Sequence, residues 1–361
     1  MSNKTIHSSS GAHGGTPASS SSGGFFRWLA QRWQENPVYS TAAVLLVMVI
    51  IQTFALGFDY PSFADWFSGW GRNWINILRN NASVGIVALG MAFVIISGGI
   101  DLAVGSTLVA VGAVMMVLIN GNANGLLTAI GITGIPAFIL GILAALLMGC
   151  LIGYINGFLI ARSKVPAFIA TLGTMKICRS VTQQFMQTVG VKVPREFTDI
   201  ANYKIGGEII LPIIYWLIIA AILVMVSRKT TFGRHVYAIG SNERAARLSG
   251  INVERVKTLV YVLSGLLVGV ASIINIARIG SMDYANAGSG YEMDAIAAVV
   301  VGGTSMSGGK GSVVGTVLGM LIIAVMNNLL NLVGVPPVLR EAFKGFIVVV
   351  AVLLQKKERA S

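Results

Sequence analysis

The chain has 361 residues, of which 55% are hydrophobic and only 11% are charged. Soluble domains carry about 25% charged residues, so a mean hydropathy of +0.76 leaves too little polar surface for a soluble protein. Cys150 and Cys178 both lie in apolar segments, and the three histidines are scattered, so the sequence indicates neither a disulfide framework nor a metal site. An integral membrane protein is the class that remains.

Both ends of the chain differ from the apolar body between them. Residues 1–24 are rich in Ser and Gly and cannot bury enough surface to offset their ordering entropy, which predicts a disordered tail. Residues 25–37 mix aromatic and basic side chains, as does a helix lying among lipid headgroups, although an ordinary polar segment is an equal alternative. We expect a transmembrane domain over 38–354 and a cytoplasmic tail over 355–361.

Apolar stretches recur along that body, and a helix that crosses a bilayer needs roughly 20 such residues. Ten spans are predicted, at residues 38–57, 80–98, 102–120, 134–160, 166–186, 209–227, 257–277, 292–306, 312–333 and 338–354. The eighth is short and contains Gly302 and Gly303. We expect it to be a broken or re-entrant helix, which a membrane tolerates only where protein or a water-filled cavity covers the backbone.

The positions of Lys and Arg predict the orientation. With the N-terminus inside, about twice as many basic residues fall in cytoplasmic segments as in outer ones, in agreement with the positive-inside rule. The net charge of +12 is therefore interpreted as topology, and nucleic-acid binding is not indicated. The predicted fold is an all-α polytopic bundle of about ten spans with both termini cytoplasmic.

Glycine-rich stretches of sequence occur at two places between paired spans. The predicted hinge glycines are Gly98, Gly99, Gly302, Gly303, Gly308 and Gly309. Transporters are often built from internal repeats with interrupted helices at the site, and the two stretches fit that pattern. A chance similarity in a glycine-rich chain is the alternative.

The longest cytoplasmic loop, residues 228–256, is the least hydrophobic part of the body. Ser241 or Asn242 is a suitable N-cap for a short helix, and Glu243 and Arg247 form an i,i+4 pair in the favoured order. Gly250 supplies a C-terminal stop, and Asn252 can then cap the next membrane helix. The pattern predicts a short surface helix that docks on a partner, with Tyr237, Ala245, Ala246 and Leu248 available for contact; a solvated connector is the alternative.

Polar side chains inside spans are costly and usually face a cavity. The candidates for a substrate pathway are Asn80, Ser97, Asp101, Asn156, Thr171, Thr174, Asn275, Asp294, Asn327, Asn328 and Asn331. Hydrogen bonding between helices is the alternative role for each. Neither Asp lies clearly at a span centre, which argues against ion coupling and for an external energy source.

A nucleotide site within the chain can be tested against the phosphate-loop motif. The stretch from Gly302 to Ser312 resembles G-x-x-x-x-G-K-[ST] superficially, but it has Thr304 where Gly is needed and Gly311 where Ser or Thr is needed. No catalytic constellation was found either. The sequence predicts a protein that is not an enzyme and binds no cofactor.

Four ordered segments carry a family resemblance. Residues 96–106 (ISGGIDLAVGS), 166–174 (PAFIATLGT), 232–253 and 291–311 resemble the ribose-type sugar permeases of ATP-binding-cassette (ABC) importers. The similarity runs from about residue 75 to the end. In the third segment it covers Gly233, Arg234, Gly240, Asn242, Glu243, Arg247 and Gly250, which together with Tyr237 are the candidate ATPase-coupling residues of the loop 228–256.

The resemblance implies a permease subunit in the cell (cytoplasmic/inner) membrane that translocates ribose or a related pentose or hexose. It implies a second permease subunit, identical or not, and a cytoplasmic ATPase pair that uses ATP and docks on the loop of Glu243 and Arg247. It also implies an extracytoplasmic sugar-binding protein. The alternative from another class is a stand-alone, ion-coupled secondary transporter of a small polar solute.

Overall fold

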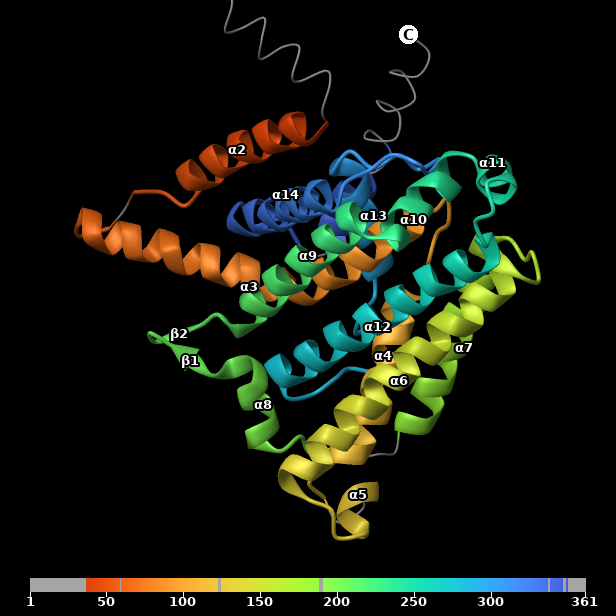
Figure 1. The fold of residues 1–361 in the computed structure, drawn as a ribbon. Coiled ribbons are helices and arrows are strands. Elements are labelled where there is room, and N and C mark those ends of the chain that lie inside the picture. The colour runs from red at the N-terminus through yellow and green to blue at the C-terminus, as the bar shows by residue number, and fades with distance from the viewer. Residues whose placement is uncertain are drawn as a thin grey trace, which may run out of the picture.

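The computed structural model describes residues 37–58, 60–122, 125–187, 191–336, 338–346 and 349, and this part is almost entirely helical (Figure 1). A short hairpin pairs β1 (Lys204–Ile205) with β2 (Glu208–Ile209). The helices are α2 (Pro37–Ala55), α3 (Phe63–Ile96), α4 (Val104–Ile119), α5 (Leu126–Ala129), α6 (Gly134–Ala161), α7 (Ala167–Met186), α8 (Arg195–Asn202), α9 (Leu211–Lys229), α10 (Thr231–Ser241), α11 (Glu243–Leu248), α12 (Val253–Ile279), α13 (Tyr291–Val301) and α14 (Val313–Leu332).

Six helices are long and apolar enough to cross a membrane: α2, α3, α6, α9, α12 and α14. The all-helical membrane architecture is thus confirmed. Each of the ten predicted spans contains helix in the part of the chain that the structure describes, although the tenth is described only over 338–346. The tail predicted for 1–24, nearly all of the segment 25–37 and the tail 355–361 lie outside the described residues.

Two predicted spans had the wrong bounds. α3 begins at Phe63 and not at residue 80. Ser62 is its N-cap, because the Ser62 side chain accepts a hydrogen bond from the Asp65 N–H. Its 34 residues extend about 51 Å, which exceeds a hydrocarbon core of roughly 30 Å. The polar and aromatic first half of α3 hid this extension, because a hydropathy pattern reports lipid contact and not helix length.

α13 is the short eighth span, and it is shorter than predicted. It ends at Val301, so its 11 residues extend about 17 Å, roughly half of a hydrocarbon core. Its middle is buried among neighbouring helices, as a half-length helix in a membrane requires. Gly302 at its end packs against the backbone of Gly315 in α14.

Glycines at four-residue spacing join α6 to α12. A Cβ atom on Gly149 or Gly153 would overlap the carbonyl oxygen of Gly265 or Tyr261, respectively, and one on Gly157 would lie 2.8 Å from the Thr258 Cα. Such spacing places small residues on one helix face, which lets two backbones touch. This seam fixes α6 against the part of α12 between Thr258 and Gly265.

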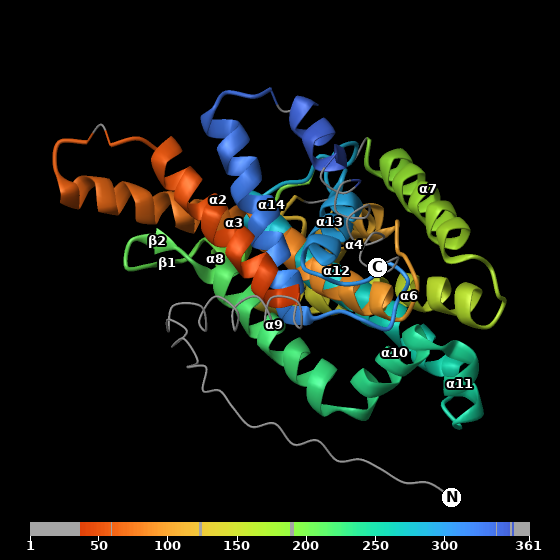
Figure 2. The same cartoon turned by 90° about the horizontal axis from the view of Figure 1, so that it is seen from above.

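The bundle separates into central and peripheral helices (Figure 2). In the most apolar window of α3, 83% of the residues are buried, compared with 11% for α2. α2 packs on α14, and the Thr41 hydroxyl donates to the Val301 carbonyl at 3.1 Å. Apolar side chains on the outer faces of α2, α6 and α9 are exposed, as expected where lipid is the neighbour.

The seam generates a stability prediction. Gly153→Ala should lower the free energy of unfolding by about 1–3 kcal/mol, because the added methyl group overlaps the α12 backbone. Thermal unfolding of the detergent-solubilised protein, followed by size-exclusion chromatography, measures the effect. Gly173→Ala on α7 is the matched control, because no atom lies within 4 Å of its added Cβ. Equal stabilities of the two variants would contradict the prediction that close contact between α6 and α12 at Gly153 stabilises the fold.

Candidate functional site

The predicted surface helix is present as α11. Asn242 is its N-cap, and the Asn242 side chain accepts a hydrogen bond from the Ala245 N–H at 3.0 Å. Gly250 adopts φ +82 after the helix, where a side chain would be strained. Asn252 then caps α12. All three local expectations for this loop are confirmed.

A second helix, α10, precedes α11 and was not predicted. Thr230 is its N-cap, accepting from the Gly233 N–H at 3.1 Å. Its apolar residues Val236 and Ile239 recur at helical spacing and are buried. The cap and this spacing were the available signals; they were overlooked because basic residues dominate the loop.

The predicted ion pair between Glu243 and Arg247 exists, but each residue has a closer partner on α12. Glu243 accepts from the Lys257 ammonium at 2.7 Å, and Arg247 donates to Glu254 at 2.7 Å. Between themselves the two are 3.5 Å apart, and Lys164 lies 3.6 Å from Glu254. Glu243 and Arg247 therefore hold α11 against the start of α12.

These contacts change the acidity of the loop. The hydrogen bond from Lys257 holds the pKa of Glu243 below its usual value, with the charges of Lys257 and Lys164 adding to the effect. Contact with Glu254 raises the pKa of Arg247 further. Glu243 is therefore ionised, and the attachment of α11 is complete, at neutral pH.

The exposed part of α11 is smaller than expected. Leu248 is 90% exposed and Ala245 is exposed, as predicted for docking residues. By contrast, Ala246 is only 4% exposed, and the half-buried Tyr237 donates its hydroxyl to the Gly311 carbonyl at 3.1 Å. The expectation that Ala246 and Tyr237 are free for docking is therefore wrong, because both pack inside the chain.

The predicted hinge glycines meet the α10 end. The Gly309 N–H donates to the Ile96 carbonyl at 2.9 Å, joining the α13–α14 loop to the end of α3. A Cβ on Gly308 would lie 2.9 Å from the Gly240 oxygen and 3.0 Å from the Gly98 nitrogen. The two glycine-rich stretches are therefore in contact with each other and with the end of α10 in the loop 228–256.

Only some of the hinge glycines need a left-handed backbone. Gly98 and Gly303 adopt φ +82 and +85, and Gly308 and Gly309 are also positive. Gly99 is required for space instead, because a Cβ there would lie 2.6 Å from the Tyr261 hydroxyl.

The eleven pathway candidates are spread over several segments, from Asn80 in α3 to Asn331 in α14. Most are hydrogen-bonded between segments of the chain, which is the alternative role given above. The pairs are Thr174 to Asn156 (2.6 Å), Ser264 to Asp101 (3.1 Å), Arg278 to Asn80 (2.8 Å), Arg340 to Asn331 (2.9 Å), and Asn328 with Asn73 (3.2 Å).

The remaining candidates differ in their surroundings. Thr171 and Ser97 donate to carbonyls of their own helices. Asn275 and Asn327 each have a buried side-chain oxygen without a hydrogen-bond partner among the described residues. These two amides therefore have hydrogen-bonding capacity left for a solute or water.

The two carboxylates lie deeper than predicted. Asp101, expected at a span end, sits in the connector between α3 and α4 and reaches Ser264 inside α12. Asp294, in the first turn of α13, is buried and pairs with the Lys344 ammonium at 3.0 Å. A partner 50 residues away explains how a buried carboxylate is tolerated, since an isolated charge there would be costly.

Arg179 is a structural anchor that the sequence reasoning did not select. From α7 its guanidinium donates to the Ala287 carbonyl at 2.7 Å and to the Ala285 carbonyl at 3.3 Å. It thereby holds the segment between α12 and α13. The available signal was a cation within a predicted span, which needs partners.

Two of the cavities near α11 contain residues of the predicted site or of its neighbour α12. One, of about 210 Å³, is lined by the hinge residues Ser97, Gly98 and Gly99 together with Glu243 and Lys257. Predicted hinge and predicted coupling residues therefore share one cavity.

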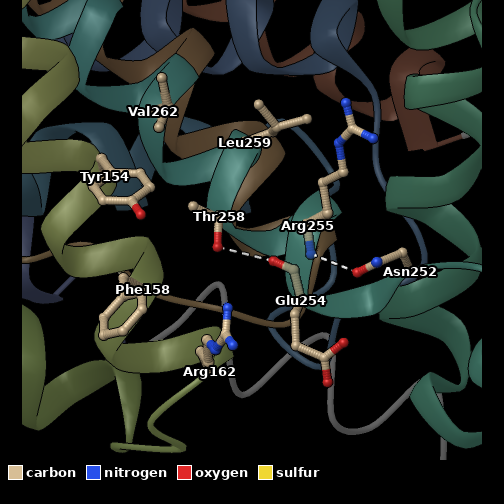
Figure 3. Close-up of a pocket in the computed structure, with 9 residues that line it drawn as sticks. All are labelled: Tyr154, Phe158, Arg162, Asn252, Glu254, Arg255, Thr258, Leu259 and Val262. Carbon is tan, nitrogen blue, oxygen red and sulfur yellow. Dashed lines mark hydrogen bonds between the residues drawn. The ribbon is translucent and has the colours of Figure 1, made fainter.

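The other cavity, of about 620 Å³, lies between α6 and α12. Figure 3 shows Tyr154 and Phe158 of α6 facing Thr258 of α12, with Arg162 and Glu254 at the rim. Its lining combines the aromatic Tyr154 and Phe158 with charged and polar side chains of Arg162, Glu254, Arg255, Asn252 and Thr258.

Comparisons with known proteins match this architecture. A family model described as "Branched-chain amino acid transport system / permease component" matches residues 73–352. The chain belongs to this permease family. The match begins within α3 and includes both hinges and the loop of α10 and α11, so only α2 among the described helices lies outside it.

Sugar permeases are among the relatives of this family member. It is 39% identical over 326 residues to the ribose import permease protein RbsC of Escherichia coli (strain K12), covering 89% of this chain and 94% of the relative. It is 41% identical over 320 residues to RbsC of Bacillus subtilis (strain 168), covering 88% and 92%. It is 34% identical over 336 residues to the galactose/methyl galactoside import permease protein MglC of Haemophilus influenzae, covering 91% and 95%. No solved structure gives a significant match.

The contact between α11 and α12 generates a prediction for this permease. Lys257→Met should raise the pKa of Glu243 toward its ordinary value, because the hydrogen bond that lowers it is lost. With the folded pKa depressed, the stabilisation of α11 is present above the ordinary glutamate pKa and is lost as the pH falls through the lowered value. A ¹³C titration of labelled glutamate carboxyls measures the shift.

Lys310→Met is the control, since Lys310 is exposed and forms no ion pair with the residues described here. An unchanged Glu243 titration in Lys257→Met, or an equal change in both variants, would show that Lys257 does not set the acidity.

Proposed function

We propose that this chain is the membrane-spanning permease subunit of an ABC importer that translocates a monosaccharide, ribose or a related pentose or hexose. The observation that carries the proposal is the 39–41% identity to ribose import permeases over nearly the full length of both chains. The family description names amino acids, whereas relatives are named for ribose, galactosides and xylose. Family membership alone therefore sets no substrate, and the relatives' names favour a sugar.

The proposed topology has ten spans over 38–354 and both termini in the cytoplasm, with the coupling loop 228–256 on that side. It is supported by the basic residues at the α11 end of the bundle, which the positive-inside rule places in the cytoplasm. They are Arg162, Lys164, Arg228, Lys229, Arg234, Arg244, Arg247, Arg255, Lys257 and Lys310.

The proposed docking element for a separate ATPase subunit is α11. Its ion pairs with α12 keep it in one orientation, and Leu248 projects from it with 90% of its surface exposed. An exposed leucine within a charged surface is suited to insertion into an apolar pocket of a partner. A second permease subunit and an extracytoplasmic sugar-binding protein complete the proposed assembly, and ATP is used by the partner and not by this chain.

A stand-alone, ion-coupled carrier is the competing proposal, and the buried carboxylates favour it. Asp101 and Asp294 both lie inside the bundle, where proton or sodium coupling would need them. Asp294 is neutralised by Lys344, and Asp101 accepts hydrogen bonds from Ser264 and from the Ala103 N–H. These contacts give both carboxylates structural roles, so the buried carboxylates favour an ion-coupled carrier only weakly.

Reconstitution separates the two proposals. Proteoliposomes that hold this chain, its ATPase and its sugar-binding protein should import labelled sugar only when ATP and both partners are present. Ribose, galactose and xylose are the sugars to compare. Uptake by this chain alone, driven by a proton or sodium gradient, would instead support the carrier.

Docking through α11 predicts a loss of partner affinity. A hot-spot side chain contributes about 2 kcal/mol, so Leu248→Ala should weaken ATPase binding roughly thirtyfold. Binding of the purified ATPase to the permease in nanodiscs measures this. Leu126→Ala on α5, an exposed leucine at the other end of the bundle, is the matched control. Equal affinities for both variants would rule out Leu248 as a contact.

A further inference from the structure

Four glycines from three separate segments meet where α3 and α10 end. We call Gly98, Gly240, Gly308 and Gly309 the glycine junction. A Cβ on Gly240 would overlap the Ile96 carbonyl and lie 2.5 Å from the Gly309 nitrogen. The backbone of α10 therefore touches the end of α3 and the α13–α14 loop with no side chain between them.

The α10 end is joined to α11 by a single residue with two roles. The Asn242 N–H donates to the Ala238 carbonyl at 3.0 Å and so caps the end of α10. The side-chain oxygen of the same residue accepts from the Ala245 N–H at 3.0 Å and caps the start of α11. With no linker between the two helices, a shift of α11 displaces the α10 end as well.

Two further contacts hold α10 to the same neighbours. Phe232 stacks on Phe93 of α3 with ring centroids 6.2 Å apart. The Tyr237 hydroxyl donates to the Gly311 carbonyl in the α13–α14 loop. The first contact joins α10 to α3, and the second joins α10 to the α13–α14 loop. These are the same two segments that Gly240 meets at the glycine junction.

The contacts between α11 and α12 are of a different kind. Arg247 and Glu243 are both substantially exposed, and exposed ion pairs contribute little to stability. They orient α11, but they resist its displacement only weakly. Backbones in van der Waals contact have no rotamer to change, so they move together or separate.

We propose that Gly240 is a positioning residue that transmits the displacement of α11 to both glycine hinges at once. In this arrangement the ends of α3 and α10 and the α13–α14 loop move as one unit, and the glycine junction converts ATPase movement into a change at both interrupted helix pairs. The proposal rests on the proposed importer function, and it assigns the coupling to a backbone contact within this chain.

The first test is Gly240→Ala in the complete transporter with its ATPase and sugar-binding protein. The added methyl group forces the α10 end away from Ile96 and Gly309. ATPase binding and ATP hydrolysis should persist, while the number of labelled sugar molecules imported per ATP falls roughly tenfold or more, as for loss of an intersite coupling. Gly173→Ala, with open space around its Cβ, should leave that ratio unchanged.

A ratio equal to that of the unaltered transporter would overturn the proposal, provided that the unaltered transporter imports sugar with ATP. If the unaltered transporter shows no ATP-dependent import, the proposed function itself fails, so the two failures are distinguishable.

A second test leaves the glycines in place and decides the question if Gly240→Ala does not assemble. Spin labels are attached at Arg244→Cys and Met306→Cys, both exposed, after Cys150 and Cys178 are changed to serine. ATP binding should leave the distance between these labels unchanged. A reference pair, Arg244→Cys with Ile169→Cys on α7, should change its distance. A change between the first two labels, or no change in either pair, would overturn the proposal.

Discussion

Direct contact between helix backbones is the constraint on which this fold depends. In a membrane, lipid is as apolar as the side chains, so helices associate through close packing and hydrogen bonds. Glycines supply that packing between α6 and α12 and between α13 and α14, where Gly319 lies on the Ala298 backbone. A side chain at any of these places would push two helices apart, and the neighbouring connections would move with them.

Close packing also explains where the chain tolerates irregular backbone and buried charge. Asp101 in the connector between α3 and α4 and the middle of the short α13 are buried in the bundle, where protein covers the polar groups. Asp294 is neutralised by Lys344, and Arg179 is satisfied by carbonyls of the segment before α13. These interrupted helices occur together with the hinge glycines, which is the arrangement transporters use around a substrate path.

The functional conclusion joins family membership to one local geometry. Permeases of this family are transport components, and the chain presents a rigid, charged helix, α11, with an exposed leucine at its tip. Because Glu243 and Arg247 are bound to α12, their role is to place α11 and Leu248, and not simply to meet a partner. The glycine junction then gives this helix a direct route to the hinges.

The sequence by itself determined what depends on neighbouring residues. Apolar runs located helices, six of which are long and apolar enough to cross a membrane. The signals at Ser241 or Asn242, at Gly250 and at Asn252 located the ends of α11 and the start of α12, because a cap involves residues three or four positions apart. Only the tertiary structure decided the partners of the polar groups. Asn328 pairs with Asn73, 255 residues away, and Gly240 meets Ile96 and Gly309. No periodicity encodes such contacts, since they arise from how the helices cross, and they give most of the predicted pathway residues hydrogen-bond partners within the chain.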